Sequence, residues 1–246
     1  MTADSRIPSN EGTWANPVDR LATTASGAAI ATVTGKRVAG PVQGFGQMWK
    51  KTFTVRIEGV EITPEELVTH WKAGFATFWP KGARFYAPLS GIAPGQVALL
   101  EIPPLLGAPI RMSTGVMVIY ADDQSFTFMT PEGHGLLGLA TFSAFRDGET
   151  TVAQVETLER TADPIIELTY MLGANRFNDQ HWLSTLENLA RSVGVASPAP
   201  LLRKVLVDKK RQWRSVTNLR YSPAFTIPIG ILTSPLRYMR RRLSTR

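Results

Sequence analysis

The sequence predicts an α+β fold in which an antiparallel sheet wraps around a single helix. Tight Pro-x-Gly and Asp-Gly turns, which are hairpin signals, join three strand-like runs of alternating apolar residues. These runs are residues 125–130, 137–145 and 150–158. The following segment, residues 178–193, spaces its large apolar side chains as one face of a helix. Those side chains are Trp182, Leu186, Leu189 and Val193.

The elements predicted before residue 125 fit the same α+β fold class. The second half of residues 47–57 alternates as a strand should. A helix is expected to begin at Thr63, because this residue can cap the first turn, Pro64 suits the first helical position and two glutamates follow. Further strands are predicted at residues 96–102 and 113–120. Strands bracketed by helices are typical of α+β proteins and not of parallel α/β sheets.

Composition divides the chain into three segments. Residues 1–40 are rich in Ala, Thr, Gly and Ser and bury too little apolar area to offset the entropy of ordering, so we expect them to be flexible. Residues 41–196 form the folded domain. Residues 197–246 form a basic, partly apolar tail that begins with the linker Ser-Pro-Ala-Pro.

The net charge of +7 is unevenly distributed. Residues 201–246 hold 12 Lys and Arg against one acidic residue, Asp208, whereas the first 200 residues hold 15 basic and 19 acidic residues. A mildly acidic domain with a strongly basic tail is typical of a tail that binds a charged surface.

The tail is a candidate for contact with anionic membranes. Residues 201–220 can form a basic amphipathic helix, and the apolar run at residues 224–232 is broken by proline and glycine and is too short to span a bilayer. A basic segment that binds nucleic acid contacts phosphates and does not need an apolar run, whereas an apolar run can enter a lipid surface. The pattern therefore favours lipid over nucleic acid. A tail that is solvated or folds onto the domain is the alternative. The candidate contact residues are Arg211, Trp213, Arg214, Phe225, Arg240, Arg241 and Arg242.

Other classes of chemistry find little support in the sequence. Cysteine is absent, which excludes disulfides, thiolate nucleophiles and cysteine-ligated metals. The three histidines lie in different predicted elements without partners at metal spacing, so no metal and no cofactor is predicted. The polar N-terminus does not have the pattern of a secretory signal. We therefore expect a cytoplasmic protein, with the possibility of contact with the inner face of the membrane.

Two sequence segments resemble the START-like, polyketide-cyclase-like superfamily (SRPBCC). They are TPEGHGLLG at residues 130–138 and NDQHWLSTLENLARSVGV at residues 178–195. The second is similar to the closing helix of many bacterial members. The resemblance covers residues 41–196. It implies a helix-grip fold, in which a curved antiparallel sheet wraps around a long C-terminal helix, with a hydrophobic cavity between them. Members bind lipids, sterols, polyketides or hormones, and a few are enzymes. No catalytic motif of an enzymatic branch matches, so no catalytic residue is assigned.

The resemblance makes a set of mainly aromatic side chains candidates for lining the cavity, although plain core packing is the alternative for each of them. His134 is included because flanking glycines place it in a turn at a possible cavity mouth, where its ring could donate to a ligand or bond the local backbone. The candidates are Trp71, Phe75, Phe78, Phe126, Phe128, His134, Phe142, Trp182 and Leu186.

These observations lead to two functional hypotheses for the domain. The first is non-catalytic binding of a hydrophobic small molecule or lipid in the cavity, driven by burial of apolar area. The second is a cyclase- or hydrolase-like enzyme that uses His134 or Glu156 as an acid or base. Strand alternation places Glu156 and Glu159 on opposite faces, so they are not expected to act as a pair. The sequence identifies neither the ligand nor the oligomeric state.

Overall fold

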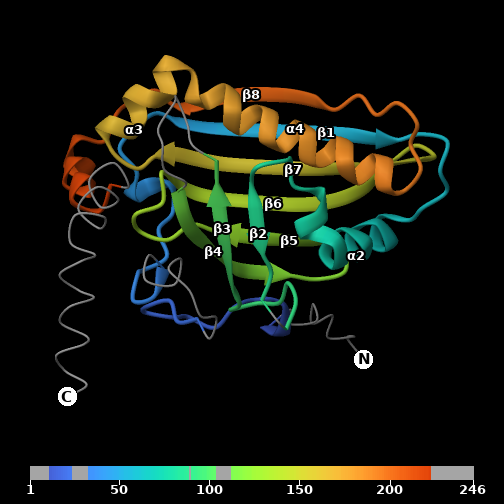
Figure 1. Cartoon of the computed structure of the whole chain (residues 1–246), viewed down its shortest axis with the longest axis horizontal. Coiled ribbons are helices and arrows are strands. Elements are labelled where there is room, and N and C mark those ends of the chain that lie inside the picture. The colour runs from blue at the N-terminus through green and yellow to red at the C-terminus, as the bar shows by residue number, and fades with distance from the viewer. Residues whose placement is uncertain (1–10, 24–32, 89, 104–111, 223–246) are drawn as a thin grey trace, which may run out of the picture.

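A single curved sheet organises the molecule. The computed structural model describes residues 11–23, 33–88, 90–103 and 112–222. Among these residues, eight strands form one antiparallel sheet in the order β2-β3-β4-β5-β6-β7-β1-β8. The sheet bends so strongly that β2, β3 and β4 run across the direction of β6, β7 and β1 (Figure 1). The strands are β1 (Met48–Ile57), β2 (Arg84–Tyr86), β3 (Val97–Ile102), β4 (Met112–Ala121), β5 (Ser125–Met129), β6 (Leu136–Asp147), β7 (Thr150–Thr161) and β8 (Leu201–Asp208).

Helices cover one face of this sheet, here called the inner face. Helix α2 (Pro64–Gly74) and the 3₁₀ turn η3 (Phe75–Phe78) connect β1 to β2, and α2 packs on β6 and β7. After β7, the short helix α3 (Pro164–Thr169) and the π turn η4 (Tyr170–Ala174) lead into α4 (Asn175–Ser192). Helix α4 lies along β1, β7 and β8 (Figure 1). The predicted α+β architecture, a curved antiparallel sheet around a long helix, is confirmed.

The predicted helix start at Thr63 is also confirmed. The Thr63 hydroxyl accepts a hydrogen bond from the Glu66 backbone N–H at 3.1 Å, and the Glu66 carboxylate accepts one from the Thr63 N–H at 2.8 Å. This reciprocal capping box pairs two backbone donors that a helix end otherwise leaves free. It sets the angle at which the chain leaves β1 and delivers α2 to the inner face.

The helix predicted for residues 201–220 is wrong. Residues 201–208 form β8, which pairs antiparallel with β1 at the edge of the sheet, and the 3₁₀ segment η5 (Trp213–Tyr221) follows. Alternation in β8 places Leu202 against the main core and Lys204 beside α4, a pattern of period two. The open edge of β1 offers backbone hydrogen bonds that an isolated amphipathic helix cannot obtain from the sheet. Residues 201–208 therefore complete the sheet as its eighth strand.

Segments near the N-terminus cover the opposite, outer face of the sheet. Leu21 and Val33 form a small core with Leu99 and Met117 of β3 and β4. A Cβ at Gly115 would lie 2.8 Å from a Val33 methyl group, so glycine at this position lets the segment approach β4 closely. The described part of residues 1–40, which we expected to be flexible, thus packs on the sheet. The 3₁₀ turn η1 (Glu11–Thr13) precedes Trp14, which pairs with Tyr120 of β4, and the 3₁₀ turn η2 (Pro41–Gln43) contacts β6 and β7.

Candidate functional site

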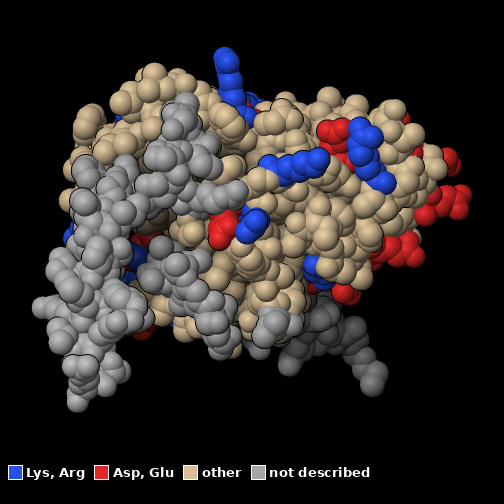
Figure 2. Space-filling model, viewed as in Figure 1, with Lys and Arg blue, Asp and Glu red and all other residues tan. Residues whose placement is uncertain are grey.

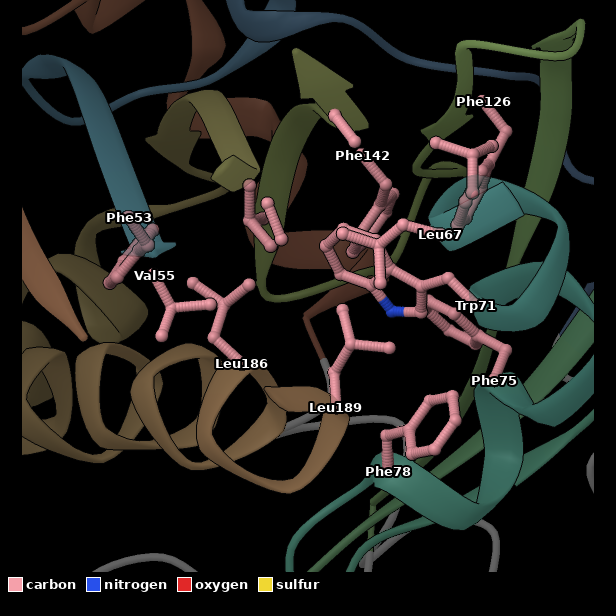
Figure 3. Close-up of a cluster of buried hydrophobic side chains, with 14 of the residues drawn as sticks. Phe53, Val55, Leu67, Trp71, Phe75, Phe78, Phe126, Phe142, Leu186 and Leu189 are labelled. Carbon is pink, nitrogen blue, oxygen red and sulfur yellow. The ribbon is translucent and has the colours of Figure 1, made fainter. Parts of the chain in front are cut away.

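Aromatic rings fill the space between the sheet and the helices. The Phe75 ring meets those of Phe85 and Phe142 edge-on, with centroids 4.7 and 5.1 Å apart. Trp71 meets Phe142 in the same way at 5.4 Å. Figure 3 shows Trp71, Phe75 and Phe142 converging from α2, η3 and the sheet. Such spacing is direct edge-to-face packing. Seven of the predicted cavity residues are buried members of this core: Trp71, Phe75, Phe78, Phe126, Phe128, Phe142 and Leu186.

Trp182 is half-buried and packs against the same core. Two indole N–H groups in this core, those of the fully buried Trp71 and the partly buried Trp79, have no hydrogen-bond acceptor among the described residues. The His181 ring lies against Trp79 and Trp182, with ring centroids 4.5 and 4.8 Å apart. Burial lowers the pKa of His181 to about 4, so its imidazole is neutral near pH 7.

A buried ion network lies beneath the N-terminal half of α4. Lys51 Nζ lies 2.7 Å from Glu159 Oε1 and 3.1 Å from Asp179 Oδ1, and Lys204 of β8 pairs with the other Asp179 oxygen. Burial alone would lower the pKa of Lys51, but the two carboxylates together raise it. Burial, followed by the same carboxylates, raises the pKa of the neighbouring Tyr170 phenol well above its ordinary value. The network joins β1, β7, α4 and β8.

A second network fixes the chain after β8. The buried Arg160 guanidinium pairs with Asp208 and donates to the Lys210 carbonyl at 2.9 Å. Arg211 Nε lies 3.0 Å from Glu167 Oε1 of α3. These contacts place the basic residues that follow β8 beside α3, where three predicted membrane-contact residues, Arg211, Trp213 and Arg214, are exposed. Phe225, Arg240, Arg241 and Arg242 lie outside the described residues.

A pocket of about 340 Å³ opens on the outer face, beyond the ends of β5, β6 and β7. Its floor is the small cluster of Ala39, Leu137 and Ala162. Leu137 lies five residues before the core residue Phe142 on the same unbroken strand, so alternation places it on the opposite face of the sheet. The pocket is therefore separate from the aromatic core between the sheet and the helices.

The walls of the pocket come from three distant parts of the chain. One wall is the segment that includes Arg37 and Val38, a second is the turn between β5 and β6, and a third is η5. The Asn218 amide of η5 donates to the carbonyls of Gln43 and Ala162 at 2.8 and 2.9 Å. The Glu132 N–H of the turn donates to the Arg37 carbonyl at 2.8 Å, so the three walls are joined by hydrogen bonds. Local patterns in the sequence contain no signal for a site assembled in this way.

His134 and Asp163 are the polar groups of most interest in this pocket. His134 Nδ1 is held by the Leu136 backbone at 2.7 and 3.0 Å, and its Nε2 makes no hydrogen bond to the described residues. Burial lowers the pKa of His134 to about 4, although the Leu136 hydrogen bond acts in the opposite direction. Asp163 is fully buried; its Oδ1 caps α3, whereas its Oδ2 has no partner among the described residues. Of the two alternatives that the sequence left open for the His134 ring, the structure shows the bond to the local backbone through Nδ1.

The acid–base chemistry considered for Glu156 finds no support in this geometry. Glu156 lies in the middle of β7, pairs with Lys50 at 2.8 Å, and is not among the pocket residues. Glu159 lies on the opposite face in the Lys51 network, as alternation predicts. The described residues contain no cluster of metal-binding side chains and no helix long and apolar enough to cross a membrane.

No protein-family model and no curated protein matches this chain. Among solved structures, protein Ms6760 from Mycobacterium smegmatis is 12% identical, with a TM-score of 0.41 over 58% of this chain and 90% of its own. The di-domain ARO/CYC protein StfQ from the steffimycin biosynthetic pathway is 11% identical, with a TM-score of 0.43 over 60% of this chain and 50% of its own. Major latex-like protein 151 from Panax ginseng is 12% identical, with a TM-score of 0.37 over 61% of this chain and 100% of its own.

Similarities with such low identities and TM-scores carry no information on ligands or reactions. The topology of the chain itself is decisive for the fold, because seven antiparallel strands are followed by a long helix on their inner face. This arrangement is the helix-grip fold that the sequence resemblance to the START-like, polyketide-cyclase-like superfamily implies.

Proposed function

We propose that this protein binds a small molecule without catalysing a reaction, and that the pocket on the outer face is the binding site. The observation that carries the proposal is a pocket of about 340 Å³ that combines an apolar floor with a buried carboxylate oxygen of Asp163, which has no hydrogen-bond partner among the described residues. This volume is at the lower end of the range of small-molecule sites. A buried polar atom without a partner is costly unless a ligand or water satisfies it.

The lining defines the class of ligand. Val38, Leu137 and Ala162 can contact a compact apolar part of a ligand. Asp163 Oδ2 can accept a hydrogen bond from a donor group on the same ligand. The neutral His134 ring adds a polar contact that does not depend on charge near pH 7. We therefore propose a small, largely apolar ligand that carries at least one hydroxyl or N–H group.

The aromatic core is the other place where a ligand was predicted. Its rings are in mutual contact, so a ligand there would have to separate Phe75 from Phe142. Such a ligand would meet the Trp71 and Trp79 indole N–H groups, which have no acceptor in the described part of the chain. The prediction of a site in this core stands as a second candidate for the location, with the same class of ligand.

Filling the pocket distinguishes the two locations. Val38→Trp places a large ring in the pocket, and Val42→Trp makes the same change at an exposed position outside it. We expect native mass spectrometry of the full-length protein to show a bound small molecule on the wild type and on Val42→Trp, and not on Val38→Trp. Anilinonaphthalene sulfonate should likewise show saturable fluorescence with the wild type and Val42→Trp, and not with Val38→Trp.

If Val38→Trp retains the bound mass and the dye, the pocket is not the site and the aromatic core becomes the better candidate. A wild-type protein with neither a bound mass nor saturable dye binding contradicts small-molecule binding at either location.

We also propose peripheral contact with anionic membranes through the basic residues after β8. Arg211, Trp213 and Arg214 are exposed on a segment that contacts Arg160 and Glu167. Basic residues near a membrane surface are attracted to anionic lipids, and tryptophan favours the interface. Sedimentation with vesicles of phosphatidylcholine and phosphatidylglycerol, compared with phosphatidylcholine alone, tests the contact. Equal recovery with both vesicles would contradict it.

A further inference from the structure

Four large apolar side chains project into solvent where α3 turns into α4. We call this group, Leu168, Met171, Leu172 and Phe177, the apolar knuckle. Their exposed fractions are 55%, 69%, 68% and 56%. Single exposed apolar residues are common on protein surfaces, but a group of large ones within ten residues of chain is typical of an interaction site.

Local geometry holds these side chains outward. Tyr170 points inward, with its ring 5.8 Å from Lys51 Nζ, and Ala174 is buried. Between them the chain forms the π turn η4, in which Gly173 adopts a φ of +116° that only glycine takes without strain. With residues 170 and 174 anchored inside, Met171 and Leu172 are directed away from the core.

Basic side chains border the apolar knuckle. Arg211 Nη2 lies 3.7 Å from Met171 Sδ, while Arg211 Nε is held by Glu167 one residue before Leu168. Arg176 lies within the knuckle itself, between Leu172 and Phe177, and is exposed. Lys209 and Lys210 precede Arg211 and are exposed as well. Apolar tips within a basic border match the chemistry of an anionic lipid surface, with acyl chains beneath charged headgroups.

The charge of the remaining surface favours the same orientation. Acidic side chains gather at the end of the molecule that carries α2 (Figure 2). The exposed acidic residues there include Glu58, Glu61, Glu65, Glu66 and Glu149. The apolar knuckle lies at the opposite end, beside α3 (Figure 1). Near an anionic membrane, this asymmetry repels the α2 end and turns the apolar knuckle towards the lipid.

We propose that the apolar knuckle inserts into the interface of an anionic lipid bilayer while Arg176, Lys210 and Arg211 contact the headgroups. The inference rests on the membrane contact proposed above and adds the apolar element that enters the bilayer. It makes binding dependent on both anionic lipid and apolar area, whereas basic residues alone would give binding that salt removes.

The absence of cysteine permits a direct test. The full-length protein carries a single introduced cysteine labelled with an environment-sensitive nitrobenzoxadiazole dye, at Met171→Cys or at Glu149→Cys. With vesicles of phosphatidylcholine and phosphatidylglycerol, we expect the dye at position 171 to shift to shorter wavelength and brighten. The dye at position 149 should not change, and phosphatidylcholine alone should have no effect at either position.

A pair of serine variants measures the contribution of the apolar area. Leu172→Ser and Leu201→Ser alter leucines that are equally exposed, 68% each, in the apolar knuckle and at the start of β8. We expect Leu172→Ser to lower vesicle affinity by about tenfold and Leu201→Ser to leave it unchanged. Both sites are at the surface, so circular dichroism should show the wild-type fold.

The outcomes separate the two proposals. Wild-type protein that does not sediment with anionic vesicles overturns the membrane contact itself. Sedimentation without a shift at position 171, and with equal affinities for the two serine variants, overturns only the role of the apolar knuckle. A shift at position 171 that depends on protein concentration without lipid identifies a second copy of the chain as the partner and also overturns the inference.

Discussion

Two neighbouring lysines on β1 have opposite surroundings, because alternation turns them to opposite faces of the sheet. Lys51 lies inside with Glu159 and Asp179, whereas Lys50 pairs with Glu156 at the surface. We expect Lys51→Met to destabilise the protein by about 3–5 kcal/mol, since the buried Glu159 then loses the lysine that pairs with it and Asp179 keeps only Lys204. The matched change Lys50→Met should cost about 0–1 kcal/mol.

Urea denaturation followed by circular dichroism measures both free energies of unfolding. Equal losses for the two variants would show that Lys51 is not the charge that compensates the buried carboxylates. Sequence patterns place Lys51 on the inner face, but they do not reveal that Asp179 of a distant helix meets it there.

Two histidines give the stability a defined pH dependence. The pKa values of His134 and His181 are lowered to about 4, so between pH 4 and pH 6.5 the unfolded chain binds more protons than the folded one. Stability therefore rises with pH across this window, is fully present above pH 6.5, and is lost as pH falls towards 4. We expect the double variant His134→Asn/His181→Asn to lose less stability than the wild type between pH 7 and pH 5.

Chemical denaturation at pH 7, 6 and 5 measures this difference in slope. An identical slope for the wild type and the double variant would contradict the lowered pKa values. The low pKa of His134 also predicts that ligand binding in the pocket is insensitive to pH between 6 and 8, as long as the ligand itself does not titrate there.

Among the elements, α2 has its start encoded most directly in the sequence. Thr63→Ala removes the hydroxyl that accepts from the Glu66 N–H, and we expect a loss of about 1 kcal/mol in the free energy of unfolding. Thr69→Ala, on the exposed side of the same helix, is the control and should have little effect. Thermal unfolding of the two variants provides the comparison, and a Thr69→Ala loss as large as that of Thr63→Ala would contradict the capping role.

Strand β8 illustrates how tertiary structure overrides a local pattern. Residues 201–208 contain Val205 and Val207, which favour strands, beside leucines and basic residues that also fit a helix. The open edge of β1 and the carboxylate of Asp179 select the strand, because both are satisfied only when β8 pairs there. A helix prediction from spacing alone cannot include either partner.

At the scale of the whole molecule, residues 201–222, which follow α4, pack against the rest of the domain as β8 and η5. A protein that ends at Pro200 lacks β8, Asp208 and η5, and so leaves the β1 edge open and Arg160 buried without its main partner. We expect this truncation to lower the unfolding midpoint in urea well below that of a protein that ends at Ser222. Similar midpoints would show that β8 contributes little to the stability of the domain.

The sequence by itself determined the antiparallel strands from β3 to β7, the capped start of α2 and the apolar face of α4. These features depend on side chains close together in the chain, through alternation, turn residues and helical spacing. Only the tertiary structure decided that β8 joins the sheet, that Lys51 meets Asp179, and that Arg37, His134 and Asn218 border one pocket. The reason is physical: such features form between segments more than eighty residues apart, whose contact depends on the path of the whole chain and not on any local pattern.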